Sequence, residues 1–193
     1  MLVEAGEVQA RFVPAYTTQS ARVVEIRADT FGLSLHQDEW TAAYPKAVVY
    51  LERGEHFEVN FEISQEGEYL IFLDVLAGAD LISAPEGELR IDGQLPAVDV
   101  PRVVFPVFYQ NVSNEFPLDR YGNQILIPQS RLMQWTKMPV WDVNFSRSMP
   151  VSIFLTRGKH SLSFNLSKES LYLGSIYFEP FNPLPSYNDY IIR

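Results

Sequence analysis

Cysteine is absent from this chain of 193 residues, and histidine occurs only three times. The lack of cysteine excludes disulfide bonds, thiolate metal sites and a cysteine nucleophile. No apolar run approaches the roughly 20 residues that a helix needs to cross a bilayer. The acidic N-terminal residues also lack the charged and apolar regions of a signal peptide. We therefore expect no membrane insertion by this chain.

Positive charge is scarce. Lysine and arginine together number 15 against 24 aspartate and glutamate residues, which gives a formal net charge of −9. A phosphate backbone would be repelled, so nucleic acid is excluded as a partner, and an anionic membrane surface is disfavoured for the same reason. Neutral ligands remain possible binding partners.

Motifs for catalysis and for metal binding are missing. There is no Gly-x-Ser-x-Gly elbow, no His-x-x-x-His pair and no acidic calcium loop. His56 and His160 each follow a Gly-x turn at the start of a predicted strand, which predicts exposed edge positions. Asp119 and Asp142 offer a carboxylate pair of the kind a glycosidase needs, but any acidic chain offers such pairs. We therefore predict that the chain is not an enzyme and holds no metal or cofactor.

Alternation of apolar and polar residues predicts strands through most of the chain. Residues 56–63 alternate strictly, and residues 68–78 form a second, more buried strand in a hairpin-like unit with the first. Other strands are predicted at 21–28, 47–52, 87–93, 150–155, 160–167 and 171–180. Only residues 35–44 have the pattern of a short helix. The sequence therefore predicts an all-β fold, an antiparallel β-sandwich of the jelly-roll type with a long ordered insertion.

The predicted organisation is one sandwich domain over residues 1–180. Residues 94–149, with six prolines, form the long insertion between strands. The aromatic and proline-rich residues 181–193 are expected to be a linker toward a following domain.

The segment 119–142 of the insertion neither alternates like a core strand nor carries a helical apolar stripe. Its aromatic residues argue against disorder, so we expect an ordered surface suited to recognition. The apolar face of a sugar stacks on an aromatic ring, and its hydroxyls need polar groups alongside. The candidate ligand-binding residues are Trp141, Trp135, Tyr121, Tyr109, Arg120, Asn123 and Asp119.

A structural role is the alternative for several of these residues. We expect one of the two tryptophans to be core, and Trp141 to be the one that is partly exposed. Asp119, Gly122 and Asn123 also have the chemistry of a turn, because Asp and Asn bond their own backbone and Gly supplies a positive φ.

Motifs spread along the chain resemble a known module. They are Gly67-Glu68-Tyr69, Ile91-Asp92-Gly93, Phe105-Pro106, Asp119-x-Tyr121-Gly122-Asn123, Pro128, Trp135, Asp142, Gly158-Lys159-His160-Ser161-Leu162, Leu173-Gly174-Ser175-Ile176, and Pro185-Ser186-Tyr187 with Tyr190. In this order they resemble the β-sandwich module ahead of the solute-binding domain in large extracellular sugar-transport-type lipoproteins of Gram-positive bacteria. That module is in turn similar to galactose-binding-like carbohydrate-binding modules.

The resemblance implies a non-catalytic accessory module that binds an oligo- or polysaccharide. It implies an extracellular location, attached to the cell surface through a parent lipoprotein, beside the solute-binding domain of an ABC-transporter-type sugar importer. The alternative is an interdomain or protein–protein interaction module that binds no sugar. Such modules often hold calcium between an early acidic residue, which Asp29 matches, and an aspartate of the last strand. The last strand here has no aspartate, so we predict no calcium of that type.

Overall fold

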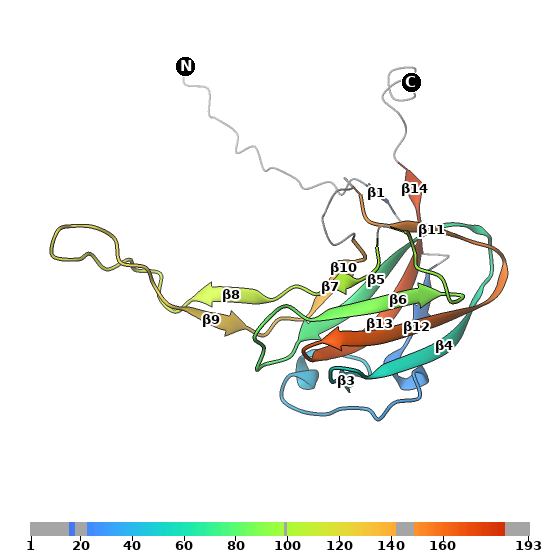
Figure 1. Ribbon diagram of the computed structural model, residues 1–193, viewed down its shortest axis with the longest axis horizontal. Coiled ribbons are helices and arrows are strands. Elements are labelled where there is room, and N and C mark those ends of the chain that lie inside the picture. The colour runs from blue at the N-terminus through green and yellow to red at the C-terminus, as the bar shows by residue number, and fades with distance from the viewer. Residues whose placement is uncertain (1–15, 18–22, 99, 142–148, 184–193) are drawn as a thin grey trace, which may run out of the picture.

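Two antiparallel sheets pack face to face and enclose a common hydrophobic core (Figure 1). The computed structural model describes residues 16–17, 23–98, 100–141 and 149–183. The six-stranded sheet contains β2 (Val24–Ile26), β3 (Val49–Leu51), β5 (Gly67–Ala77), β10 (Thr136–Pro139), β11 (Ser152–Leu155) and β13 (Leu171–Pro180). The four-stranded sheet contains β4 (His56–Ile63), β6 (Glu86–Ile91), β7 (Val103–Val104) and β12 (Gly158–Lys168), and β1 (Tyr16–Thr17) pairs with β14 (Asn182–Pro183). The predicted all-β jelly-roll sandwich is confirmed.

The two sheets differ in how their strands are buried. Strand β4 alternates without exception between exposed and buried residues, so only one of its faces meets the core. Strands β5 and β13 are buried at almost every position. The central strands of the six-stranded sheet are therefore covered on the outer face as well as on the core face, whereas β10, β11 and β2 keep exposed positions.

The connection between β4 and β5 differs from the predicted hairpin. Strand β4 pairs with β12, whereas β5 pairs with β10, β11 and β13, so the two strands lie in opposite sheets. The Tyr69 hydroxyl donates a hydrogen bond of 2.6 Å to the Gln65 carbonyl and braces the crossing between the sheets. The hairpin prediction was wrong because β5 carries apolar residues on both faces, and a central strand of the covered sheet buries both.

Residues 35–44 do not form the predicted helix. They run as irregular chain with one 3₁₀ turn, η3 (Thr41–Ala43); a second 3₁₀ turn, η2 (Ala28–Thr30), follows β2. The Asp38 carboxylate accepts hydrogen bonds of 2.9 Å from the backbone N–H groups of both Trp40 and Thr41. Such local bonds offer the backbone an alternative to a helix.

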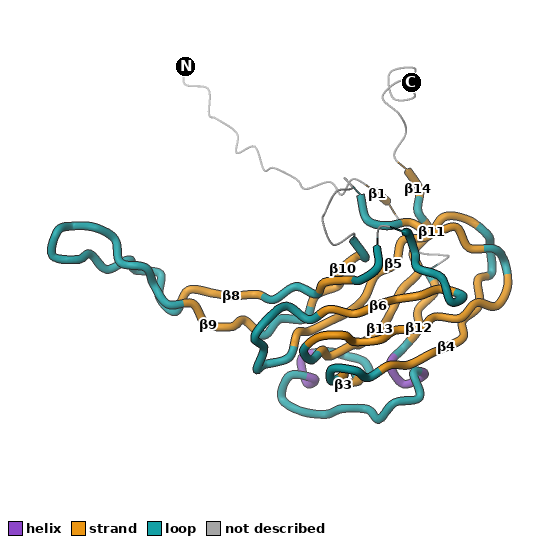
Figure 2. Tube along the Cα trace, in the orientation of Figure 1, coloured by secondary structure: helices purple, strands orange, loops and turns teal. Residues whose placement is uncertain are grey.

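The described residues of the range 94–149 contain four strands. Strand β7 joins the four-stranded sheet and β10 the six-stranded sheet, while β8 (Phe108–Asn111) and β9 (Gln129–Leu132) pair with each other. These two strands begin an arm, residues 108–132, that projects away from the sandwich (Figures 1 and 2). Beyond them, the Val112 N–H donates to the Pro128 carbonyl at 3.1 Å and the Ile125 N–H to the Pro117 carbonyl at 2.8 Å. The expected irregular segment is therefore a paired ribbon for much of its length.

Two of the motifs behind the family resemblance meet in the structure. Asp92 and Gly93 have positive φ angles of 50° and 75°, as the tight turn after β6 requires. The Asp92 carboxylate accepts a hydrogen bond of 2.8 Å from the Ser161 N–H and lies 2.7 Å from Nδ1 of His160. The turn after β6 is thus joined to the start of β12.

His160 is only 9% exposed, so its predicted exposed position was wrong, whereas His56 is exposed as expected. The ring of His160 lies in phase with the buried Leu162 of β12 and next to the ring of Phe61, with 5.6 Å between the two centroids. Alternation along the strand places it on the core face.

Candidate functional site

The outer face of the six-stranded sheet carries a cluster of aromatic side chains. On β5, Leu73 and Val75 point into the main core, so Leu76 points to the opposite face. There Leu76 pairs with Tyr172 of β13, which pairs in turn with Tyr50 of β3. Residues 35–48 pack over this row. The aromatic cluster comprises His36, Trp40, Tyr44, Tyr50, Trp135 and Tyr172.

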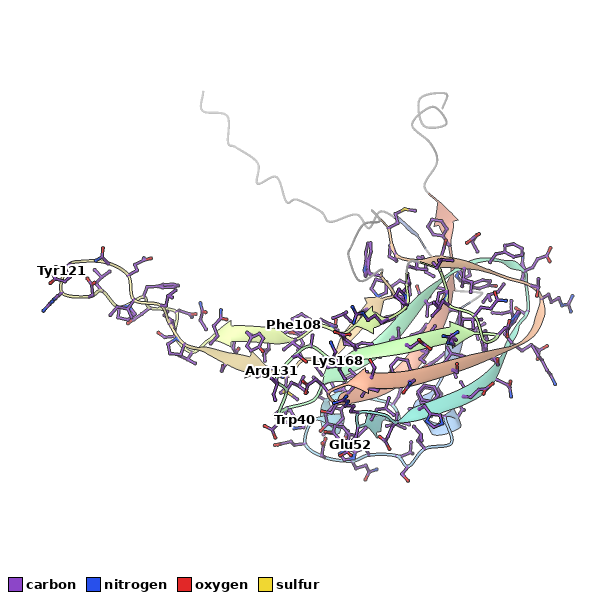
Figure 3. The ribbon with its side chains drawn as sticks, viewed as in Figure 1. Trp40, Glu52, Phe108, Tyr121, Arg131 and Lys168 are labelled. Carbon is purple, nitrogen blue, oxygen red and sulfur yellow. The ribbon has the colours of Figure 1, made fainter. Side chains whose placement is uncertain are left out.

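Tyr44 and Trp135 form the stacked pair of this cluster. Their ring centroids lie 4.4 Å apart with an interplanar angle of 22°, and both rings are half-buried. The indole N–H of Trp135 donates a hydrogen bond of 3.0 Å to the Trp40 carbonyl, which fixes the orientation of the indole. Figure 3 shows Trp40 beside the root of the arm. The pair is thus held in place while part of it remains accessible to solvent.

Gly174 leaves room for the Tyr44 ring to pack directly on β13. The register between β13 and β5 shifts around this glycine, and a Cβ atom at Gly174 would lie 2.5 Å from Cζ of Tyr44. The Tyr44 hydroxyl donates to the Asp74 carboxylate at 2.7 Å and accepts from the Ser175 N–H at 3.2 Å. Burial, followed by the hydrogen bond to Asp74, raises the pKa of the Tyr44 hydroxyl. Tyr44 is therefore a neutral, fixed side chain.

Asp38 anchors the loop that carries Trp40. Its carboxylate accepts a hydrogen bond of 2.6 Å from the Tyr172 hydroxyl and lies 3.1 Å from Nε2 of His36. Burial works to raise the pKa of Asp38, but the hydrogen bonds from Tyr172, Thr41 and His36 hold it below its ordinary value. The loop is thus fastened to β13 by an ionised carboxylate.

A polar strip continues the same face beyond the aromatic cluster. It comprises Glu25, Lys46, Asp74, Lys137, Ser175, Tyr177 and Glu179. The Tyr177 ring lies between two ammonium groups, with Nζ of Lys137 at 4.1 Å from its centroid and Nζ of Lys46 at 5.3 Å. Burial and the hydrogen bond to Asp74 raise the pKa of Tyr177 to about 12.

The two lysines of the polar strip are both ion-paired. Lys46 contacts Glu25 at 2.6 Å, and Lys137 contacts Glu179. The strip holds three carboxylates, including Asp74, against these two ammonium groups, so it does not favour an anionic ligand. The strip therefore presents hydrogen-bond donors and acceptors beside aromatic rings, an arrangement suited to a hydroxyl-bearing ligand. In the described ranges, no group of three histidine, aspartate or glutamate side chains is placed to hold a metal ion.

The structure spreads the predicted ligand-binding residues over separate places. Trp135 lies in the aromatic cluster, and Trp141 follows β10. The other five, Tyr109, Asp119, Arg120, Tyr121 and Asn123, lie on the arm. Both tryptophans are half-buried, so the expectation that one of them is core was wrong, whereas Trp141 is partly exposed as expected. Asp142 lies outside the described residues.

The tip of the arm is a turn built by Asp119. Its carboxylate accepts hydrogen bonds from the backbone N–H groups of Tyr121 and Asn123 at 2.8 and 2.9 Å, and from the Asn123 amide at 3.1 Å. Gly122 adopts a φ of 85°, which glycine accommodates without strain. Asp119 and Asn123 therefore have the structural role considered as the alternative, while the Tyr121 ring is exposed at the tip (Figure 3).

The arm is also the most apolar exposed part of the described chain. Seven of the twelve large apolar side chains that are exposed there lie on it: Tyr109, Val112, Phe116, Leu118, Tyr121, Ile125 and Leu126. At its root, one guanidinium nitrogen of Arg131 donates to the Gly78 carbonyl at 2.8 Å and to the Ala77 carbonyl at 3.3 Å. The root is thus fastened to the end of β5.

Sequence reasoning missed Tyr44 and Tyr177, which lie far from the tryptophans along the chain. Tyr44 lies in the segment predicted to be a helix, and Tyr177 lies in a predicted strand for which no ligand-binding residue was proposed. One signal was available. A glycine inside a strand, as at Gly174, often marks the close approach of another group.

No protein-family model and no curated protein matches the chain. Among solved structures, the C-terminal CBM6 module of the laminarinase LamC from Zobellia galactanivorans is similar, with a TM-score of 0.50 and 12% identity over 81% of this chain and 98% of that one. The Podospora anserina GH26-CBM35 β-(1,4)-mannanase gives a TM-score of 0.51 and 10% identity over 86% of this chain. This chain spans only 29% of that enzyme's length. At such low identity the likeness concerns the fold, and the fold is a β-sandwich like that of carbohydrate-binding modules.

Proposed function

We propose that this chain is a non-catalytic carbohydrate-binding module. The observation that carries the proposal is the half-buried Tyr44–Trp135 stack beside the polar strip, on one face of the six-stranded sheet. The apolar face of a sugar ring packs on such rings, while its hydroxyls bond the neighbouring polar groups. The likeness of the fold to the LamC module supports the same class of ligand, an oligo- or polysaccharide.

We place this module outside the cell, attached to the surface through a parent lipoprotein. The order of its sequence motifs, including Ile91-Asp92-Gly93 and Leu173-Gly174-Ser175-Ile176, supports a position ahead of the solute-binding domain of an ABC-transporter-type sugar importer. In that setting the module would hold glycan near the importer, and the solute-binding domain is its adjoining partner. Within the described residues, no helix has the length and hydrophobicity of a membrane span.

Affinity gel electrophoresis against laminarin, β-1,4-mannan and bacterial wall polysaccharides tests glycan binding. We expect at least one polysaccharide to retard the wild-type chain, and Trp135→Ala to weaken that retardation by about tenfold or more, because stacking on the indole is lost. Phe154→Ala is the matched control, since Phe154 is 58% exposed on β11 and lies outside the aromatic cluster. If no polysaccharide retards the wild type, the carbohydrate function is refuted.

Two further variants locate the binding surface. Trp135→Phe keeps an aromatic ring and is expected to retain much of the affinity, which separates stacking from a loss of folding. Trp141→Ala tests the second tryptophan in the same gels. Binding that survives Trp135→Ala but fails in Trp141→Ala would move the site away from the Tyr44–Trp135 stack.

The second candidate function is an interaction module that binds no sugar. The apolar surface of the arm favours it, because large exposed apolar patches rimmed by polar groups mark interaction sites. In this case the arm packs against the adjoining solute-binding domain. The gels discriminate the two functions, since the interaction module predicts no retardation by any polysaccharide.

A further inference from the structure

The middle of the arm holds an apolar hollow that the carbohydrate function leaves unused. It has a volume of about 570 Å³. Its lining includes Val112, Phe116, Ile125 and Leu126, and Glu115 is the only charged residue among the lining side chains. Leu126 is 92% exposed beside this hollow. The arm thus presents a depression and a projecting apolar side chain at the same level.

The arm is electrically neutral on a strongly acidic chain. Arg120 and Arg131 balance Glu115 and Asp119, so the remainder of the chain carries the whole net charge of −9. Two copies of the sandwich would repel each other at close range. Two arms can meet without that repulsion.

A two-stranded ribbon alone in water is only marginally stable, and the arm extends well beyond the sheets that support its root (Figure 1). A second ribbon packed on its apolar side chains would supply the missing partner. Only one face of this 25-residue ribbon can meet a partner, so the interface is smaller than the roughly 20 to 30 residues a side of a standard interface, as expected for a weak dimer.

We infer that the arm is a dimerisation element whose occupant is the arm of a second copy of this chain. The two arms pack antiparallel about a two-fold axis at the level of Leu126, which lies midway between Tyr121 at the tip and Arg131 at the root. The two Leu126 side chains then meet at the axis, each at the rim of the other arm's hollow, as a self-complementary interface requires.

Antiparallel packing also keeps the acidic bodies apart. The arm spans roughly 40 Å between Phe108 and Tyr121 at about 3.3 Å per residue. The two sandwiches are then separated by about one arm length, several times the Debye length of about 8 Å at physiological salt. The dimer therefore forms without close contact between like charges.

Sedimentation equilibrium of the full chain tests this inference. We expect the wild type to dimerise at concentrations up to roughly 100 μM, and Leu126→Asp to weaken the dimer by at least about tenfold, because two carboxylates would face each other at the axis. Ile82→Asp is the matched control, since Ile82 is fully exposed and lies outside the arm. Circular dichroism of each variant verifies that the sandwich is folded.

A mixing experiment shows whether the partner is a second copy. Leu126→Asp and Leu126→Lys are each expected to be monomeric alone, and their equimolar mixture to regain a dimer, because opposite charges then meet at the axis. A monomeric wild type over the whole concentration range overturns the inference, as does a dimer that Leu126→Asp leaves intact. Glycan binding is read separately through Trp135, so either proposal can fail without the other.

Discussion

Replacing Asp92 by asparagine is expected to destabilise the fold and to remove most of the pH dependence that His160 confers on it. Both ring nitrogens of His160 face acceptors: Nδ1 lies 2.7 Å from the Asp92 carboxylate and Nε2 lies 2.8 Å from the Thr156 carbonyl. Only the doubly protonated ring satisfies both contacts. These two contacts therefore favour the cationic form of the buried imidazole and raise its pKa.

The direction in which the stability of the fold changes with pH follows from the pKa shifts of His160 and Asp92. Burial works to lower the pKa of His160, but the bonds to Asp92 and Thr156 raise it overall. This stabilisation is complete below the unfolded value of about 6.5 and is lost as the pH rises through the folded pKa. Burial works to raise the pKa of Asp92, but bonds from His160 and Ser161 lower it, so its contribution is present above about pH 3.9 and is lost as the pH falls through the folded pKa.

The size of the effect follows from the exposure of the pair. A hydrogen bond to a charged group contributes about 1.5–3 kcal/mol, and solvent screening places this pair at the lower end because the Asp92 side chain is 51% exposed. Asparagine keeps an oxygen for the Ser161 N–H but loses the charge. We expect Asp92→Asn to lower the free energy of unfolding by about 1.5 kcal/mol near pH 5.5, and by less near pH 8.5.

Urea denaturation of wild type and variant at both pH values measures this difference. His56→Gln is the control, because His56 is exposed and its removal should leave the pH dependence in place. Equal destabilisation at the two pH values would refute the reasoning. So would an NMR titration in which His160 loses its proton below about pH 6.5.

Three further substitutions probe the face, the arm and the core. Gly174→Ala should destabilise the fold by about 1–3 kcal/mol in urea, because the new Cβ meets the Tyr44 ring; in a Tyr44→Ala background most of that cost should vanish. Arg131→Ala should speed amide hydrogen exchange in the arm while the exchange of β5 stays slow, because the clamp on the Gly78 carbonyl is lost; equal acceleration in both would contradict the assigned role. Phe164→Ala should cost about 3–5 kcal/mol of unfolding free energy in urea, since its ring is fully buried, and a loss below about 1 kcal/mol would contradict its place in the core.

The strands could be predicted from the sequence because each has a local pattern, either alternation as in β4 or an apolar run as in β5 and β13. Strand β4 occupies the predicted residues 56–63, and β13 the predicted residues 171–180. The pairing of the strands could not be predicted in the same way. A short turn between β4 and β5 fits a hairpin and a crossing between sheets equally well, and long-range burial of both faces of β5 decides between them.

The site was predicted only in part. The aromatic pattern of the sequence indicated Trp135 as a site residue. Its stacking partner Tyr44 was missed because residues 35–44 have the pattern of a helix, which the hydrogen bonds of the Asp38 carboxylate to the backbone replace in the structure. The Asp119 turn was predicted from local chemistry alone, and the structure shows that turn. The projection of the arm could not be foreseen, because it depends on which strands β7 and β10 join.

Strand β9 of the arm runs into β10 of the six-stranded sheet through only Met133, Gln134 and Trp135. The arm and Trp135 are therefore consecutive along the chain. Arg131 ties the arm side of this link to the Gly78 carbonyl, and β10 on the other side pairs with β5. A tilt of the arm that strained the Arg131 clamp would therefore turn the indole against Tyr44. If the two are coupled in this way, a ligand that selects one orientation of the arm also selects one geometry of the stack, and by thermodynamic reciprocity a molecule bound on the stack biases the direction in which the arm points.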